Sequence, residues 1–390
     1  MDLSYILNVL GEEREKYFNA IAPPVIQTSN FSFQTVDGLR NAFYAEEATH
    51  LYTRGNNPTV EILRKKLAAL AGAEDALVFG SGAAAMTAAV FSQVKSGDHI
   101  VCVNHPYGWT EKLCRVILSR FGVETTFVDG RDVANYEIAC RPNTKVFILE
   151  SPNTFTFEIQ DIRAIARLAK SRGLVSIIDN TYCTPLGQKV LEMGIDIEVH
   201  SASKYLNGHS DVVAGAVMAR KDIIQKMFHS EFMNFGAILA PQDAWLMLRG
   251  LRTLPIRLKQ VAESTEKVVS FLENHHAVEA MHYPFSEKSE QYELAKTQMD
   301  WCGGLFSVSL KTTDVRAIER FCEALQFFKM AVSWGGHESL VLPACAFHKT
   351  TETNIAPRHR YPINLVRFYV GLESAEDLIA DLKQALMLLV

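Results

Sequence analysis

Short apolar runs alternate with stretches of helical periodicity over the first 250 residues of the chain. Each run holds four or five residues with few polar side chains, which is typical of strands buried on both faces of a parallel sheet. The longer stretches between the runs have room for the helices that connect parallel strands. We predict strands at 76–79, 99–103, 145–149, 174–178 and 215–218, and with them an α/β fold around a mostly parallel sheet.

Two helix starts are marked by the residue types that begin helices. The Asn-Pro pair at 57–58 predicts a helix from 59 to about 71, because proline fits the first helical turn. A Gly-Ser-Gly turn at 80–82 leads from the first strand into an alanine-rich helix. The segment 76–94 has no charged residue, but the glycines interrupt it. We therefore interpret it as a buried strand, a turn and a buried helix rather than a membrane span.

The last third of the chain has an α+β pattern. Strands are predicted at 305–310 and 365–370, and helices from 241, over 258–274, over 315–325 and from 373 onward. The first 50 residues show one short helical pattern and then a proline-rich polar stretch that is too irregular to bury itself. We predict three parts: an N-terminal arm at 1–50, a cofactor-binding α/β domain at 51–250 and an α+β domain at 251–390.

The composition is that of a soluble globular protein, with 48% hydrophobic residues, 21% charged residues and a formal net charge of −5. No basic run or stripe is present, so nothing favours a nucleic acid partner. The N-terminus is acidic where a signal peptide is basic, so we expect neither export nor a membrane anchor. Seven cysteines without a Cys-x-x-Cys pair indicate no disulfide framework, which favours a reducing cytoplasm. No metal is expected, because no ligand spacing is found among the histidines His275, His276, His337, His348 and His359.

Lys204 stands in an unusual setting for a lysine. Its neighbours Ser203 and Tyr205 are uncharged, and the nearest acidic residues in the sequence are Glu198 and Asp211. A poorly solvated site lowers the pKa of an amine and makes it a nucleophile able to form a Schiff base. By local sequence alone, a plain lysine in a serine- and glycine-rich loop is the alternative.

A carboxylate earlier in the chain favours the chemical interpretation. The strand at 174–178 ends in Asp179, and open α/β sheets bind ligands at the carboxyl ends of their strands. Enzymes that use pyridoxal 5'-phosphate (PLP) need a lysine to hold the cofactor as an imine and an aspartate to keep its pyridine nitrogen protonated. Lys204 and Asp179 together predict PLP, bound covalently through Lys204.

The sequence around both residues resembles a known enzyme family. Asp-Asn-Thr at 179–181 and Ser-Ala-Ser-Lys-Tyr-Leu-Asn-Gly-His-Ser-Asp-Val at 201–212 are similar to the Cys/Met-metabolism (transsulfuration) family of PLP enzymes. Further motifs follow in the family order, from Ala-Pro-Pro at 22–24 to Arg367. The resemblance implies the aspartate aminotransferase-like fold (fold type I), with a large, mostly parallel domain and a smaller α+β domain. It also implies a homotetramer, a dimer of dimers with shared active sites, in which the arm packs on a neighbouring subunit.

The resemblance implies that several residues bind the cofactor. Tyr52 and Arg54 match residues that reach across a subunit interface to the cofactor phosphate, which the planar fork of an arginine can bind bidentately. Tyr107 matches the tyrosine that stacks on the pyridine ring and helps to deprotonate the incoming amine. The remaining cofactor-binding residues are predicted to be Gly82, Ala83, Asp179, Ser201, Ser203 and Lys204.

Ser333 and Arg367 are implied to hold the α-carboxylate of the substrate. Arg367 lies in an otherwise apolar strand, where a buried arginine requires a partner for its charge. That partner is either the α-carboxylate of a substrate, bound bidentately, or an acidic side chain in a buried ion pair.

Three positions depart from the family pattern. Ala83 stands where a methionine is usual, which a backbone contact tolerates. Trp109 follows Gly108, where relatives have a smaller residue, so it either narrows the pocket or faces the core. Thr154 stands where γ-acting members have an asparagine for the phenolic oxygen of the cofactor, and Asn153 comes one residue earlier.

The motifs divide between the β-acting and γ-acting branches. Trp334 and Thr-Phe-Glu at 156–158 resemble bacterial cystathionine β-lyases, whereas the segment 52–59 and Val332 are closer to γ-acting enzymes. We predict a PLP-dependent carbon–sulfur lyase, with β-elimination of cystathionine or cysteine-type substrates to pyruvate, ammonia and a thiol as the main interpretation. The alternatives are cystathionine γ-synthase activity, γ-lyase activity on methionine or cystathionine and, more remotely, a non-catalytic binding protein with the PLP fold.

Overall fold

The computed structural model describes residues 1–347 and 361–389. His348 and His359 lie outside the described residues. Within those residues, no group of three or more His, Cys, Asp or Glu side chains is placed to hold a metal ion. Over the same residues, no helix combines the length and apolarity needed to cross a membrane.

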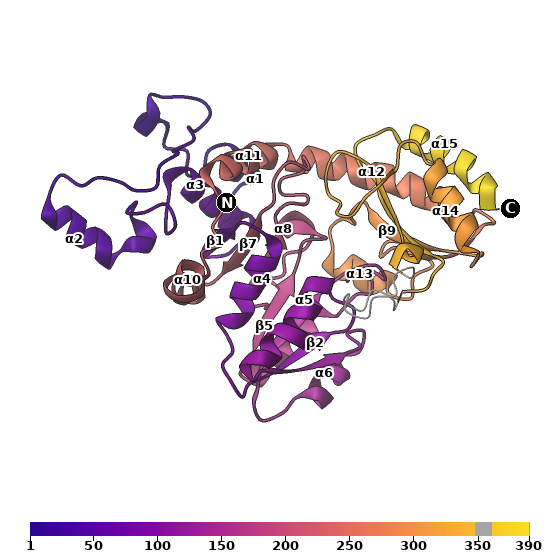
Figure 1. Cartoon of the computed structure of the whole chain (residues 1–390), viewed down its shortest axis with the longest axis horizontal. Helices are drawn as coiled ribbons and strands as arrows, with labels where there is room; N and C mark the ends of the chain where they lie inside the picture. Colours follow the sequence, from indigo (N-terminus) through magenta and orange to yellow (C-terminus); the bar gives the residue numbers. More distant parts are fainter. Residues whose placement is uncertain (348–360, 390) are drawn as a thin grey trace.

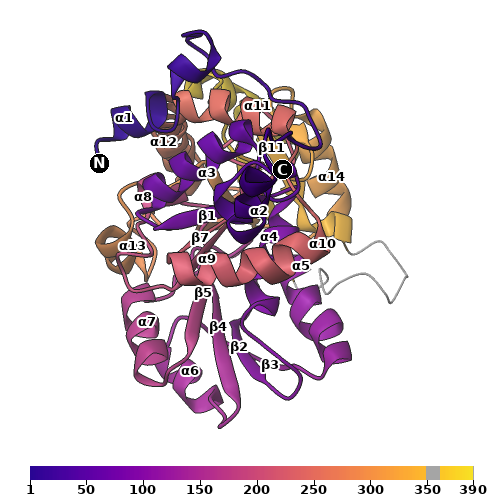
Figure 2. The same cartoon turned by 90° about the vertical axis from the view of Figure 1, so that its left-hand side faces the viewer.

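A sheet of seven strands forms the centre of the larger part of the molecule (Figures 1 and 2). Its order is β1-β7-β6-β5-β4-β2-β3, with parallel pairing from β6 to β3, while β7 runs antiparallel to both β1 and β6. The mostly parallel sheet is therefore confirmed. The strands are β1 Asp75–Phe79, β2 His99–Val103, β3 Glu124–Val128, β4 Thr144–Glu150, β5 Val175–Asp179, β6 Ile197–Ser201 and β7 Gly215–Ala219.

Helices cover both faces of this sheet, which explains the apolar runs. In β4, Val146 and Ile148 pack in one core with α4 (Gly82–Phe91), whereas Phe147 and Leu149 pack in a second core with α7 (Ile162–Ser171). Successive side chains of a strand point to opposite faces, so helices on both faces bury both sets of side chains, and in β4 only Lys145 is exposed. The other helices of this part are α3 Pro58–Ala71, α5 Gly108–Lys112, α6 Val133–Ala139, α8 Thr184–Gly187, α9 Lys221–Met227, α10 Met233–Phe235 and α11 Pro241–Arg252.

The carboxyl ends of the central strands meet at one edge of the sheet. The register pairs Glu150, the last residue of β4, with Asp179, the last residue of β5. Asp179 in turn pairs with Val199 of β6, and the chain leaves β6 at Ser201 and reaches Lys204. The topology thus brings Glu150, Asp179 and Lys204 to the edge where open α/β sheets bind ligands.

A second sheet, of five strands, lies in the C-terminal part, shown in orange to yellow in Figure 1. Its order is β10-β11-β12-β9-β8. Helix α12 begins at Leu254 rather than at 258, because Pro255 sits in the first turn, where its missing N–H costs no helical hydrogen bond. The elements are β8 Val278–His282, β9 Leu305–Leu310, β10 Lys329–Met330, β11 Leu340–Pro343, β12 Leu365–Tyr369, α12 Leu254–Glu273, α13 Tyr292–Gln298, α14 Val315–Ala324 and α15 Ala375–Leu386.

The first helix, α1 (Leu3–Asn8), is tied to the body by a buried lysine of α3. Lys66 donates to the backbone carbonyls of Ile6 and Leu7 at 2.9 and 3.0 Å, and its Nζ lies 3.2 Å from the carboxylate of Glu12. A cation at the C-terminal end of a helix satisfies carbonyls that have no helical partner. The start of the chain is therefore anchored.

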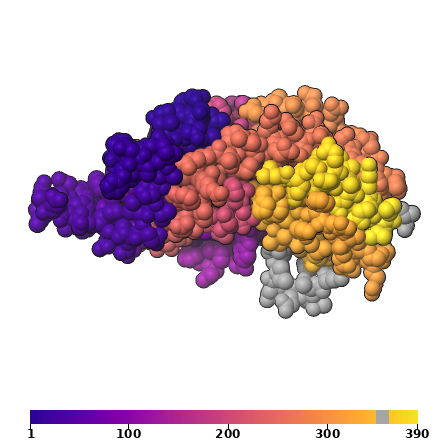
Figure 3. Space-filling model, turned by 90° about the horizontal axis from the view of Figure 1, so that it is seen from above, coloured from indigo at the N-terminus to yellow at the C-terminus, as the bar shows by residue number. Residues whose placement is uncertain are grey.

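The segment that carries α2 (Val36–Tyr44) projects from the body (Figures 1 and 3). The sequence pattern did not predict this helix, which Thr35 caps by accepting from the N–H of Gly38. Val36, Phe43 and Tyr44 are 74%, 65% and 85% exposed. Exposed apolar side chains of this kind suit an arm that packs on a neighbouring subunit. The arm's contact and the domain limits at 50 and 250 stay predictions.

Candidate active site

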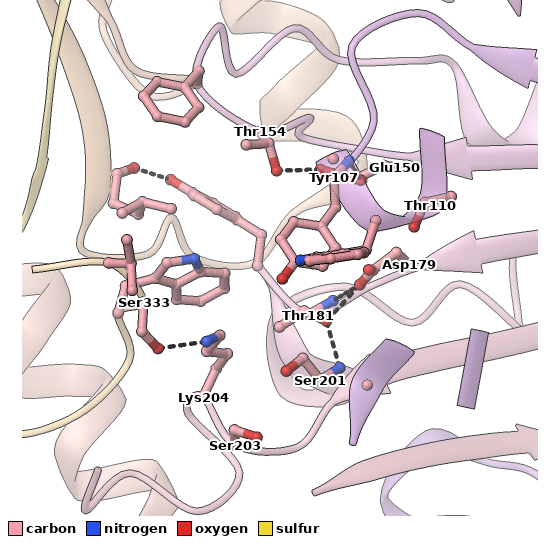
Figure 4. A pocket seen from close by; sticks show the side chains of 18 of the residues that line it. Tyr107, Thr110, Glu150, Thr154, Asp179, Thr181, Ser201, Ser203, Lys204 and Ser333 are labelled. Carbon is pink, nitrogen blue, oxygen red and sulfur yellow. Dashed lines mark hydrogen bonds between the residues drawn. The ribbon is translucent and has the colours of Figure 1, made fainter. Parts of the chain in front are cut away.

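A cavity of about 800 Å³ lies at the carboxyl ends of β4 and β5, and residues of the smaller sheet close its other side (Figure 4). It is lined by nine of the eleven predicted site residues, namely Gly82, Ala83, Tyr107, Asp179, Ser201, Ser203, Lys204, Ser333 and Arg367. Tyr52 and Arg54 do not line it. They lie beside each other, with the Arg54 Cζ atom 5.6 Å from the centre of the Tyr52 ring.

Lys204 reaches into the cavity and contacts the smaller sheet's side of it. Its Nζ donates to the Oγ of Ser333 at 2.5 Å (Figure 4). Burial and, to a smaller extent, the positive charge of Arg367 lower the pKa of Lys204 to about 8, although the negative charge of Asp179 opposes both effects. At pH 7 about one amine in ten is then neutral, against about one in three thousand for an ordinary lysine. The alternative of a plain loop lysine does not fit this setting.

Asp179 is held by two hydrogen bonds at the bottom of the cavity. The backbone N–H of Thr181 donates to its Oδ1 at 3.0 Å, and the Thr181 hydroxyl donates to the same oxygen. Burial raises the pKa of Asp179 above its usual value, although these hydrogen bonds and the positive charge of Lys204 oppose the rise. The carboxylate is thus ordered, desolvated and suited to pair with a cationic ring nitrogen.

Glu150 is a site residue that the sequence interpretation missed. Its Oε2 accepts from the backbone N–H of Tyr107 and its Oε1 from the hydroxyl of Thr154, both at 2.6 Å (Figure 4). Burial and the nearby charge of Asp179 raise the pKa of Glu150 to about 8, so at pH 7 Glu150 is mostly neutral. A carboxylate at the end of each of two successive predicted strands was the signal that could have revealed it.

The side of the cavity formed by the start of α4 is suited to an anion. The side chain of Ser81 accepts from the N–H of Ala84 and so begins α4, whose first residues Gly82 and Ala83 line the cavity. A Cβ on Gly82 would lie 2.7 Å from the Cα of Ser201, so only glycine allows this close approach. A helix N-terminus offers backbone N–H groups and a favourable dipole to a phosphate. Ser203 also lines the cavity, but its hydroxyl bonds to the backbone of Ala214.

Two tryptophans shape the walls of the cavity. Trp109 is 51% exposed and lines the cavity, so the alternative in which it faces the core is wrong. Trp334 packs against the rings of Tyr182 and Tyr205, with centroids 6.3 and 5.4 Å away. The Nζ of Lys204 is 5.9 Å from the centre of the Trp334 ring.

Arg367 projects from the middle of β12 and is only 7% exposed. It lines the cavity, and its Cζ atom lies 4.5 Å from the centre of the Phe155 ring. Phe155 has a φ of 69° and Ser333 a φ of 78°. Left-handed backbone of this kind costs a bulky residue on the order of 1–3 kcal/mol, and it tends to be kept at functional sites.

The loop after β4 explains the two positions whose roles the sequence left open. Asn153 organises the loop, because its Oδ1 accepts from the Thr156 hydroxyl at 2.7 Å and from the N–H of Glu158 at 3.1 Å. Thr154 turns its hydroxyl to Glu150. The loop is therefore ordered by its own side chains and presents Phe155 to the cavity.

The family of Cys/Met metabolism PLP-dependent enzymes matches the chain over residues 6–387. The chain belongs to this family. Among its relatives, an L-methionine gamma-lyase of Treponema denticola is 40% identical over 380 residues, which are 96% of this chain and 94% of that protein. A cystathionine beta-lyase of Lactococcus lactis subsp. cremoris is 34% identical over 377 residues, 96% of either chain. The crystal structure of metB from Corynebacterium glutamicum has a TM-score of 0.92 at 32% identity and covers 100% of this chain and 99% of that one.

Membership of the Cys/Met-metabolism family confirms PLP as the cofactor and the PLP-dependent fold that the sequence predicted. The residues present fit the group. A lysine with a lowered pKa, an aspartate held by Thr181 and a glycine-containing helix start line the same cavity. The lysine suits the aldehyde of the cofactor, the aspartate suits its pyridine nitrogen, and the helix start suits its phosphate.

Proposed function

We propose that this member of the family is a carbon–sulfur lyase that acts on a sulfur amino acid, with β-elimination as its main reaction. The observation that carries the proposal is the meeting of Lys204, Asp179 and Arg367 in one cavity, with Lys204 partly neutral at physiological pH. A neutral amine can attack a carbonyl group and can take a proton from carbon. An ammonium group can do neither.

PLP, when bound, withdraws electrons from the α-carbon of an amino acid and so makes its proton removable. The protein's part is to hold and move charge. Asp179 would hold the ring nitrogen and Tyr107 would cover the ring, while Arg367 with Ser333 would orient the α-carboxylate of the substrate. Lys204 would hold the aldehyde of the cofactor and, as a neutral amine, would take the Cα proton.

Loss of the thiol from Cβ completes a balanced β-elimination. Cystathionine and one water give homocysteine, pyruvate and ammonia, and no oxidant or reductant is consumed. Trp334 and the Thr-Phe-Glu segment at 156–158 support β-elimination, because both resemble the corresponding positions of bacterial cystathionine β-lyases.

γ-Elimination is the second candidate. It is supported by the 40% identity to an L-methionine gamma-lyase and by the segment 52–59. The two reactions separate on one measurement. The pure enzyme is incubated with cystathionine, and pyruvate supports β-elimination, whereas 2-oxobutyrate supports γ-elimination. An enzyme that releases neither keto acid from cystathionine or methionine would contradict the lyase proposal.

Arg367→Ala is expected to lower kcat/KM at least about tenfold to a hundredfold for every amino-acid substrate, because a charge-assisted bidentate pair is worth about 1.5–3 kcal/mol. Arg367→Lys should recover little, since an ammonium group cannot reproduce the planar fork. Kinetics and melting temperature are measured on the same variant. A variant with a lower melting temperature and normal kinetics would mean that Arg367 serves only a structural ion pair.

We further propose that the enzyme works in the cytoplasm as a homotetramer, a dimer of dimers, in which Tyr52 and Arg54 complete the site of a neighbour. The supporting observations are that both residues lie outside the cavity of their own chain and that α2 exposes apolar side chains. The cysteine pattern supports the compartment.

Hybrid oligomers test the shared site. Arg54→Ala is expected to weaken cofactor binding, and mixing it with Lys204→Ala should restore part of the activity, because one site of each mixed pair then holds both native residues. Native mass spectrometry checks that subunits exchange. If the exchanged mixtures stay inactive, each chain builds its own site.

A further inference from the structure

Phe155 lies against the guanidinium of Arg367, at the side of the cavity where we place the substrate carboxylate. The Arg367 Cζ atom is 4.5 Å from the centre of the Phe155 ring, and the two residues are 7% and 5% exposed. The face of an aromatic ring attracts a cation, and the attraction is stronger where water is excluded. The ring therefore favours one placement of the guanidinium.

The Phe155 ring is itself fixed by the smaller part of the molecule. It stacks on Tyr361 with centroids 4.4 Å apart and an interplanar angle of 26°, and it meets the edge of Phe347 at 5.8 Å. Phe155, Tyr361 and Leu365 share a small apolar core, and Leu365 is the first residue of β12, the strand that carries Arg367. The aromatic contact thus ties the loop after β4 to the strand that supplies the cation.

The loop keeps Phe155 in a conformation that its residue type does not favour. The φ of 69° lies in the left-handed region, and the hydrogen bonds of Asn153 hold the loop around it. Phe157, two residues later, has a φ of 54°, is 4% exposed and also lines the cavity. Its ring packs 5.7 Å from that of Tyr182.

We propose that Phe155 is a positioning residue for substrate binding, which holds the Arg367 guanidinium so that its planar fork faces the α-carboxylate of the incoming amino acid. The inference rests on the carboxylate-binding role proposed for Arg367. It adds a determinant that acts on every substrate alike, because all of them carry the carboxylate. It predicts an effect on binding rather than on bond breaking.

Phe155→Leu is expected to raise the KM for cystathionine about 2- to 30-fold, the range that a partly desolvated cation–π contact supports. The kcat should stay within about twofold, because the carboxylate is bound equally in the ground state and the transition state. The inhibition constant of propionate should rise by a similar factor. Propionate has a carboxylate but no amine, so it reports on the clamp without any chemistry at Lys204.

Two variants serve as controls. Phe157→Leu shortens an aromatic residue of similar burial and backbone conformation, whose ring packs against Tyr182 instead of Arg367. Its propionate constant should therefore change less than that of Phe155→Leu. Phe155→Tyr keeps the ring and should bind propionate nearly as the native enzyme does. In an Arg367→Ala background, Phe155→Leu should add less than about twofold, because the cation it supports is gone.

Three outcomes would overturn the inference. The first is an equal rise of the propionate constant in Phe155→Leu and Phe157→Leu. The second is a Phe155→Leu enzyme with a lower melting temperature and lower kcat but an unchanged propionate constant, which marks a purely structural residue. The third is an unchanged propionate constant in Arg367→Ala, which would refute the proposed role of Arg367 itself. This outcome is measured on Arg367→Ala alone, so it is distinguishable from the other two. If Phe155→Leu does not fold, Phe155→Met replaces it in the same comparison.

Discussion

Replacing Lys204 by alanine is expected to lower kcat by at least about 10³-fold with little change in melting temperature. A positioned general base contributes about 10²–10⁴-fold, and the same amine also holds the cofactor. Lys204→Arg should be equally inactive, because a guanidinium keeps its proton at any physiological pH. Steady-state kinetics with cystathionine and a thermal melt measure both quantities.

A second buried lysine provides the matched control. Lys66 is 1% exposed and burial lowers its pKa, as for Lys204, but it pairs with Glu12 beneath α1. Lys66→Met should lower the melting temperature and leave kcat of the folded enzyme nearly unchanged. Borohydride reduction of the native enzyme should attach the cofactor to the peptide that contains Lys204. A Lys204→Ala enzyme that keeps more than a tenth of its kcat would refute the assignment, as would a protein that stays colourless and inactive with added PLP.

Asp179→Asn is expected to lower kcat about 10²- to 4 × 10³-fold. Removing one partner of a buried ion pair costs about 3–5 kcal/mol, and each 1.4 kcal/mol is a factor of ten in rate. Asparagine keeps the size of the side chain and can still accept the hydrogen bonds from Thr181, so the fold should persist. The variant should also lose PLP faster on dialysis than the native enzyme does.

Glu150→Gln is the control for Asp179→Asn. It tests whether the loss of activity comes from the charge of Asp179 or from the loss of any carboxyl group at this place. Glu150 pairs with Asp179 in the sheet, but its pKa is raised to about 8, so at pH 7 the substitution removes little charge. We expect its kcat to fall less than about tenfold. If Glu150→Gln and Asp179→Asn lose activity equally, the loss at Asp179 does not come from the charge of its carboxylate.

Five strands of the larger sheet could be predicted because helices bury both of their faces. β6 escaped prediction because it contains Glu198 and His200, which are buried and lie 2.7 Å apart as a pair. Asn180 completes this pair by donating to Glu198 at 2.7 Å. In the sequence, a strand that contains two such polar residues looks like an exposed segment, because the contacts that satisfy them inside the protein are not apparent. β3 escaped because two of its five residues are threonines and it begins with an exposed glutamate.

The sequence by itself determined the chemistry of the site, because a cofactor restricts the residue types that can serve it. Asp179 was identifiable from its place after an apolar strand, Lys204 from its uncharged neighbours, and Arg367 from its isolation in an apolar strand. The tertiary structure alone decided which neighbours these residues have. Glu150 meets Asp179 only through the register of β4 and β5, and Phe155 meets Arg367 only because the two sheets pack around one cavity. Such contacts depend on how segments distant in the sequence pack together, and the local pattern of residues along the chain does not predict that packing.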